Sequence, residues 1–196
     1  MTVDRNALRS ALRQQRRAIP AAQRISAAEA VAERLLCLPF APVDGYVAGY
    51  WALDGEIALH AWQLRLQPAV IYCLPVLHED DRLRFAPWRP GDALVSNRYG
   101  IPEPDVAATS LLDADAMQLV AVPTVGFDAR CQRLGMGGGW YDRSFSFRQN
   151  ISAPPWLAGV AFSTQHIDAL PQQPWDVRLD AICTESDSFL VDTTPA

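Results

Sequence analysis

Apolar residues recur every three to four positions through the N-terminal part of the chain. This spacing predicts one helix over residues 4–18 and a second over residues 20–37. Pro20 is well placed to start the second helix, because proline suits the first helical position. The two prolines in residues 38–42 should end that helix. The expected apolar faces consist of Ala7, Leu8, Ala11 and Leu12, and of Ile25, Ala28, Ala32, Leu35 and Leu36.

Beyond residue 42, short apolar runs alternate with segments of helical pattern. Helices are expected over residues 57–66 and 141–147. Residues 80–81 should form a turn, residues 99–104 an extended segment and residues 105–115 a surface connection. Strands are expected over residues 46–51, 70–74, 76–77, 83–88, 119–123, 156–162 and 181–184.

The alternation of strands with helices is typical of an α/β fold. We expect a mostly parallel sheet flanked by helices on both faces, in a Rossmann-like three-layer arrangement with an N-terminal helical pair. A chain of 196 residues with 49% apolar content fits a single domain over residues 1–196, which buries roughly 70% of its unfolded surface. Ligands then belong at the carboxyl ends of the strands.

Charge and hydropathy exclude several classes of partner. No apolar run approaches the roughly 18 residues that cross a membrane, and the arginine-rich N-terminal region lacks the features of a signal peptide. We therefore expect a soluble, cytoplasmic protein with no membrane partner. The net charge of −5 disfavours nucleic acid as a partner.

All 17 residues counted as lysine or arginine are arginine. This excludes a Schiff-base lysine, a pyridoxal enzyme and a P-loop lysine. The cysteines form no C-x-x-C pair and the histidines show no ligand spacing, which argues against a zinc ribbon or a redox centre. Cys37, Cys73 and Cys183 lie in apolar stretches and are expected in the core, whereas Cys131 lies in a loop.

Residues 133–142 form the glycine-rich stretch Arg-Leu-Gly-Met-Gly-Gly-Gly-Trp-Tyr-Asp. It follows an expected strand and precedes an expected helix, an order that suits phosphate binding by main-chain N–H groups. Arg133 would add a permanent cation, and Asp142 could hold a metal ion. Neither general phosphate motif fits, since Trp140 replaces the last glycine of G-x-G-x-x-G and the chain has no lysine. A plain surface loop would account for the glycines equally well.

Two further positions could carry chemistry. Arg5 and Arg9 lie four residues apart on the first expected helix, so both can point at one anion, although a solvated basic face explains them too. Glu56 lies between an expected strand and helix, where a favourable contact with the helix dipole is the alternative to a functional role.

The stretch from Pro123 to Asp142 resembles the signature of the 5-formyltetrahydrofolate cyclo-ligases, Pro-x-x-x-Phe-Asp followed by Arg-Leu-Gly-x-Gly-x-Gly-Tyr-Tyr-Asp. Residues 99–104 resemble that family's Gly-Ile-x-x-Pro segment, and residues 170–185 resemble its closing motif. Arg5 and Arg9 resemble its N-terminal Lys-x-x-x-Arg pattern, so the likeness covers nearly the whole chain in the right order.

The resemblance implies an ATP- and Mg²⁺-dependent cyclisation of 5-formyltetrahydrofolate to 5,10-methenyltetrahydrofolate, with release of ADP and phosphate through a phosphorylated formyl intermediate. It implies catalytic roles for Glu56, Arg133 and Tyr141, and Mg²⁺ binding by Asp142 and Asp176. Folate would contact Trp51, Glu56 and Trp140. ATP would contact Arg5, Arg9, Arg133, Leu134, Gly135, Met136, Gly137, Gly138, Gly139, Trp140 and Tyr141.

Several positions depart from the family pattern. Arg5 replaces a lysine, Trp140 a tyrosine, Cys131 a common glycine, and Met136 a residue that is often a cation or tyrosine. Two alternatives therefore stay open. One is a non-catalytic module that binds nucleotide or folate, and the other is a phosphosugar isomerase of related layout.

Overall fold

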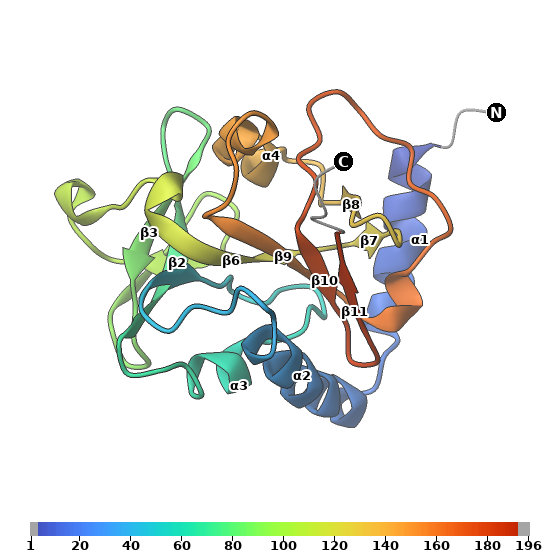
Figure 1. Ribbon diagram of the computed structural model, residues 1–196, viewed down its shortest axis with the longest axis horizontal. Helices are drawn as coiled ribbons and strands as arrows, with labels where there is room; N and C mark the ends of the chain where they lie inside the picture. Colours follow the sequence, from blue (N-terminus) through green and yellow to red (C-terminus); the bar gives the residue numbers. More distant parts are fainter. Residues whose placement is uncertain (1–3, 192–196) are drawn as a thin grey trace.

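The computed structural model describes residues 4–191 and is built around one seven-stranded sheet (Figure 1). The strand order is β11-β10-β9-β6-β1-β2-β3. The five inner strands are parallel, while β3 and β11 pair antiparallel at the two edges. The expected α/β fold with a mostly parallel sheet is confirmed. The strands are β1 (Gly45–Ala48), β2 (Val70–Leu77), β3 (Leu83–Pro87), β6 (Met117–Pro123), β9 (Trp156–Val160), β10 (Ala181–Cys183) and β11 (Ser188–Leu190).

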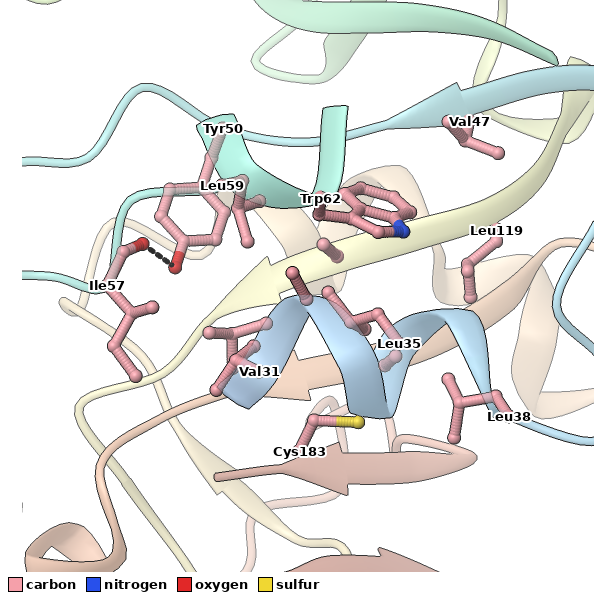
Figure 2. Packing of buried hydrophobic residues seen from close by; sticks show 14 of the residues in the cluster. Val31, Leu35, Leu38, Val47, Tyr50, Ile57, Leu59, Trp62, Leu119 and Cys183 are labelled. Carbon is pink, nitrogen blue, oxygen red and sulfur yellow. Dashed lines mark hydrogen bonds between the residues drawn. The ribbon is translucent and has the colours of Figure 1, made fainter. Parts of the chain in front are cut away.

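The inner strands are apolar along their whole length because both faces of the sheet are covered. In β6, Leu119 and Ala121 join one buried cluster, while Val120 and Val122 join the cluster on the opposite face. Figure 2 shows Leu119 in the first cluster, close to Trp62. The alternation along β6 thus holds a helical layer on each side of the sheet.

The first face is covered by α2 (Ala21–Leu36) and the short α3 (His60–Gln63). Figure 2 shows Val31 and Leu35 of α2 packed over the strands, with Cys183 beneath them. The opposite face is covered by α4 (Trp140–Ser144) and the 3₁₀ turn η3 (Ser146–Gln149), which bring Phe145 and Phe147 into the second cluster.

Both expected N-terminal helices are present, but they pack in different hydrophobic clusters. Asp4 caps α1 (Arg5–Arg17) by accepting a hydrogen bond of 2.8 Å from the Asn6 N–H. Leu12 of α1 packs in a small third cluster against the two-stranded ribbon of β7 (Gly126–Phe127) and β8 (Arg133–Leu134). In Figure 1, α1 and α2 lie apart, so the expected helical pair is not a packed hairpin.

The expected helix over residues 57–66 is wrong outside the four residues of α3. Ile57 and Leu59 are buried in an irregular segment that leads into the helix. The Ile57 carbonyl accepts a hydrogen bond of 2.8 Å from the Tyr50 hydroxyl, drawn in Figure 2, and so is engaged outside any helix. Tertiary burial therefore overrides the local helical pattern.

Three smaller expectations also need correction. β1 ends at Ala48, whereas residues 46–51 were expected as strand. β2 continues through Pro75, so the strands expected over residues 70–74 and 76–77 are one. Cys37 is exposed at the C-cap of α2, since the apolar face of that helix ends at Leu35; Cys73 and Cys183 are buried as expected.

The remaining short elements are the ribbon of β4 (Leu94–Ser96) and β5 (Pro102–Pro104), and the 3₁₀ turns η1 (Ala108–Ser110), η2 (Ala114–Ala116) and η4 (Ser163–Gln165). Within residues 4–191, no helix combines the length and apolar character needed to cross a membrane.

Candidate active site

A cavity of about 890 Å³ lies at the carboxyl ends of the parallel strands. Its walls include Trp51 after β1, Leu77 at the end of β2 and Pro123 at the end of β6. With one exception, every site residue expected from the sequence lines it. The exception is Leu134, whose side chain is fully buried in the small cluster with Leu12 because β8 turns it away from the cavity.

The glycine-rich loop over residues 135–139 forms one wall of this cavity. Gly137 has a φ of +101° and Gly139 a φ of +68°, values that residues with a Cβ rarely adopt. A Cβ on Gly139 would lie 2.5 Å from the Arg143 Nη1. The loop conformation therefore depends on glycine, and it leaves the main chain open to a ligand.

Arginines from α1 and from β8 line the same end of the cavity. Arg9 donates from Nε to the Gly135 carbonyl at 2.9 Å, which ties α1 to the glycine-rich loop. Arg5 forms two hydrogen bonds with Asp176, at 2.7 and 3.3 Å. Burial, together with the nearby Arg5 guanidinium, lowers the pKa of Arg9. An anionic ligand between these like charges would relieve their repulsion.

The two carboxylates expected to bind metal lie at this end. Asp142 Oδ1 accepts a hydrogen bond of 2.8 Å from Arg133 and one of 3.1 Å from the Val177 N–H. That second bond brings Asp176, the residue before Val177, to the same wall. Over residues 4–191, no three acidic, histidine or cysteine side chains gather into a metal-binding group. Two carboxylates still fit Mg²⁺ when phosphate oxygens complete its shell.

Glu56 lies on a tight loop that α1 holds in place. Asp54 in this loop has a φ of +53° and accepts hydrogen bonds from Arg13 at 2.7 Å and from Arg16 at 3.0 Å. Arg17 also pairs with Asp54. Burial opposes ionisation of Asp54, but the hydrogen bonds from Arg13 and Arg17 outweigh it and hold its pKa below the ordinary value.

Glu56 itself is largely withdrawn from water. Its Oε2 accepts a hydrogen bond of 3.0 Å from the Leu53 N–H, and its Oε1 lies 3.5 Å from Arg16 Nη1. The side chain of Arg16 is only 1% exposed, and this Nη1 has no hydrogen-bond partner among residues 4–191. Burial raises the pKa of Glu56 despite the hydrogen bond from Leu53 and the charge of Arg16.

Aromatic side chains form part of the cavity wall. Trp51 meets Trp88 edge to face, with ring centroids 5.9 Å apart, and Trp140 meets Tyr99 similarly at 6.5 Å. Arg133 lies over the ring of Tyr141, 5.7 Å from its centroid, and burial raises the pKa of that phenol. These flat surfaces suit a flat ring system.

Several residues that line or support the cavity were not identified from the sequence. Arg13 continues the four-residue spacing of Arg5 and Arg9, so the helical pattern could have identified it. Glu103 lies inside the segment matched to Gly-Ile-x-x-Pro. Arg16 had no such signal, because its partner Asp54 is placed by the fold.

Asp128 and Cys131 shape the turn that leads into β8 and the glycine-rich loop. The buried Asp128 accepts hydrogen bonds from the N–H groups of Arg130, Gln132 and Leu170, at 2.9, 3.2 and 3.1 Å. Burial opposes its ionisation, but the hydrogen bonds, led by the Arg130 side chain, keep its pKa low. Cys131 is buried with a φ of +59°, which accounts for the glycine common at this position in the pattern.

Comparisons with known proteins identify the family of the chain. The sequence profile of the 5-formyltetrahydrofolate cyclo-ligase family matches residues 1–185. The 5-formyltetrahydrofolate cyclo-ligase of Haemophilus influenzae is 34% identical over 182 residues, covering 91% of this chain and 96% of that protein. The protein of the same name from Escherichia coli K12 is 34% identical over 179 residues, covering 89% of this chain and 97% of that protein.

A solved structure is similar over nearly the whole fold. The NMR structure of 5,10-methenyltetrahydrofolate synthetase from Aquifex aeolicus has a TM-score of 0.80 and 26% identity, covering 98% of this chain and 95% of that one. The profile match extends over both ends of the cavity, from Arg5 to Asp176. The chain therefore belongs to the 5-formyltetrahydrofolate cyclo-ligase family and is a ligase.

Proposed function

We propose that this chain uses ATP and Mg²⁺ to cyclise 5-formyltetrahydrofolate to 5,10-methenyltetrahydrofolate, releasing ADP and phosphate. The observation that carries this proposal is one continuous cavity with two different ends. One end gathers Arg5, Arg9 and Arg133 around a glycine-rich loop, and another part presents a buried Glu56 beside Trp51. The first end suits a polyphosphate and the second a reduced pterin.

The chemistry explains why both ligands must share a cavity. A formyl amide is a poor electrophile, and its oxygen is a poor leaving group. Transfer of the γ-phosphoryl group to the formyl oxygen expels ADP and gives an activated carbon. The side-arm nitrogen then attacks that carbon and loses its proton, and the C–O bond to phosphate breaks to leave the methenyl product.

The arginines and the glycine-rich loop are proposed to hold the transferring phosphoryl group. Guanidinium groups bind phosphate as a fork, and Arg5 and Arg9 would present two such forks from one helix. Charge stabilisation and in-line positioning supply most of the rate enhancement in phosphoryl transfer. Bound Mg²⁺ would neutralise phosphate charge, held by Asp142 and Asp176 together with the phosphate oxygens.

Glu56 is proposed to orient the side-arm nitrogen and accept its proton. A carboxylate with a raised pKa is a stronger base than an exposed one, which suits removal of a proton from a weakly basic nitrogen. Tyr141 would close the wall between the two ends, because its ring lies against Arg133 and it lines the cavity. Trp51 and Trp140 would contact the folate rings.

The direct test is product formation by the purified chain. With 5-formyltetrahydrofolate, ATP and Mg²⁺ present, we expect absorbance of the methenyl product together with one ADP and one phosphate per turnover. Omitting ATP or Mg²⁺ should abolish the signal. A folded protein that binds both ligands without turnover would instead be a binding module, a reading prompted by Met136 and the other departures from the family pattern.

A further inference from the structure

Glu103 is a buried carboxylate in the cavity wall that the proposed chemistry does not use. It lies in β5, and the residue is only 7% exposed. Its Oε1 accepts two hydrogen bonds, one of 2.9 Å from the Leu77 N–H and one of 2.7 Å from the Asn97 amide. These bonds fix the carboxylate plane between the end of β2 and the β4–β5 ribbon.

The turn that contains Asn97 is itself held by hydrogen bonds. The Asn97 Oδ1 accepts from the N–H groups of Tyr99 and Ile101, at 2.8 and 3.0 Å. Gly100 in this turn has a φ of +74°. Asn97 is therefore oriented with its oxygen toward the turn and its amide toward Glu103, which leaves the carboxylate no freedom to rotate away.

The second carboxylate oxygen is unused. Among residues 4–191, Glu103 Oε2 receives no hydrogen bond and Glu103 has no salt-bridge partner, this oxygen is not completely buried, and Glu103 lines the cavity. An ionised oxygen in a largely apolar site is costly unless donors reach it. Hydrogen-bond donors on a bound ligand would therefore satisfy Glu103 Oε2.

The surroundings of Glu103 determine which donors fit. The neighbouring cavity residues Leu77, Tyr99 and Ile101 are uncharged. The arginines that suit phosphate come from α1 and β8, elements that Figure 1 shows apart from β2 although they line the same cavity. A carboxylate here repels phosphate and matches a flat heterocycle that carries adjacent N–H donors.

We propose that Glu103 Oε2 binds the amino group and adjacent ring N–H of the substrate's 2-amino-4-oxopyrimidine ring. This assignment rests on the proposed function, because it takes 5-formyltetrahydrofolate as the ligand. Glu103 is then a specificity-determining residue, and Asn97 is its positioning residue. The assignment places the pyrimidine edge at the β4–β5 ribbon and directs the formyl group toward Glu56.

Glu103→Gln tests this assignment with almost no change of shape. The glutamine oxygen can still accept from Leu77 and Asn97, so its NH₂ group must face the ligand donors. We expect the Kd and KM for 5-formyltetrahydrofolate to rise about 10- to 100-fold, the scale of a charged hydrogen bond, with the KM for ATP unchanged. Glu79→Gln, on the exposed hairpin after β2, is the matched control and should change neither.

A ligand-side change separates recognition from a structural effect. An analogue with methyl in place of the 2-amino group should bind the wild type about tenfold or more weaker, while Glu103→Gln should discriminate little between the two ligands. Direct binding is measured, so the result is independent of turnover. The assignment would be overturned if the wild type and Glu103→Gln discriminated equally between the two ligands. It would also be overturned if Glu103→Gln lost ATP affinity and folate affinity to the same extent. Absence of ATP-dependent turnover in a wild type that discriminates would instead contradict the proposed function.

Discussion

Glu56 combines a stability cost with the chemistry assigned to it. Burial raises its pKa, so the folded protein binds the Glu56 proton more tightly than the unfolded chain does. The resulting contribution to stability is present in full below the unfolded pKa, near 4.3, and is lost as pH rises through the folded pKa. The ionised form of Glu56 in the folded protein is therefore a buried charge that opposes folding.

Glu56→Gln should accordingly melt at a higher temperature than the wild type at pH 8. The difference should shrink as pH falls toward 4, because both proteins are then neutral at this position. Turnover should fall about 100-fold or more, the scale of lost proton transfer, with ATP affinity unchanged. Thermal unfolding across the pH range and steady-state kinetics measure the two effects. A variant less stable than the wild type at pH 8 would show that the ion pair with Arg16 outweighs burial.

Arg16 and Arg17 offer a matched pair, since both contact Asp54 but only Arg16 is near Glu56. Arg16→Met should cost about 3–5 kcal/mol of unfolding free energy, because it strands a buried carboxylate. Arg17→Met removes an exposed partner and should cost less than about 1 kcal/mol. Denaturant unfolding measures both.

The pH profile of turnover distinguishes a positioning role for Arg16 from a purely structural one. The ionisable groups that face Glu56 come from several segments. They are Arg13 and Arg16 of α1, Asp54, Tyr50 and Tyr141. Without the Arg16 charge, the Glu56 pKa should rise further, and the acidic limb of the profile should move to higher pH. Arg17→Met should leave that limb in place, and an unmoved limb in Arg16→Met would contradict the role.

The sequence identified residues well where chemistry follows local pattern. The glycine-rich loop and the Arg5-Arg9 spacing led to side chains that do line the cavity. Leu134 does not line the cavity, because the two-residue strand β8 turns its side chain into the small buried cluster with Leu12. Arg16 was missed because its acidic partners lie far away in sequence, and Glu103 was missed because the burial of its carboxylate is visible only in the fold.

At the scale of elements, α1 is a bridge between distant segments of the cavity wall. Arg5 contacts Asp176 near its start, Arg9 contacts the glycine-rich loop in its middle, and Arg16 contacts Asp54 near its end. Its apolar anchor is small, consisting mainly of Leu12 in the third cluster. The position of α1 therefore depends on few apolar contacts and many charged ones.

Leu12→Ala should test that dependence. Loss of the buried leucine should cost about 2–5 kcal/mol and loosen the docking of α1. Because Arg5 and Arg9 move with the helix, the KM for ATP should rise more than the KM for 5-formyltetrahydrofolate. Leu8→Ala, on the partly exposed rim of the same cluster, is the milder control. Equal rises in both KM values would show that α1 does not serve the nucleotide end specifically.

Asp142 and Asp176 come from α4 and from the irregular segment after η4, yet they are proposed to share one Mg²⁺. Asp142→Asn and Asp176→Asn should each lower turnover on the order of 10²–10³-fold and raise the Mg²⁺ requirement. The double variant should lose much less than the product of the single losses, because both act through one ion. Multiplicative losses with unchanged Mg²⁺ dependence would show independent roles.

The sheet was predictable as an element, whereas the helices around it were less so. Apolar runs such as residues 119–123 specify buried strands by composition alone. The helix over residues 57–66 failed because Tyr50 engages the Ile57 carbonyl from an adjacent segment. Strand order also lay beyond the sequence, since it depends on which distant runs pair.

At the scale of the whole molecule, the cavity is assembled from most of the elements around one edge of the sheet. Ligands that contact several of these elements bind only the folded chain and should stabilise it. Mg²⁺-ATP at 100 times its Kd should raise the free energy of unfolding by about 2.7 kcal/mol. Thermal unfolding with and without Mg²⁺-ATP measures this effect, with Mg²⁺-AMP as the control. An equal shift with AMP would locate the stabilisation away from the phosphate end.

The contact between Arg5 and Asp176, separated by 171 positions, has a consequence for biosynthesis. Translation at roughly 5–20 residues per second leaves α1 outside the ribosome for on the order of ten to thirty seconds before Asp176 is made. During that interval Arg5 lacks its acidic partner Asp176, and until the glycine-rich loop has been made Arg9 lacks the Gly135 carbonyl. A nascent chain stalled before residue 133 should therefore expose α1 to protease, and one extended past residue 176 and clear of the ribosome tunnel should protect it.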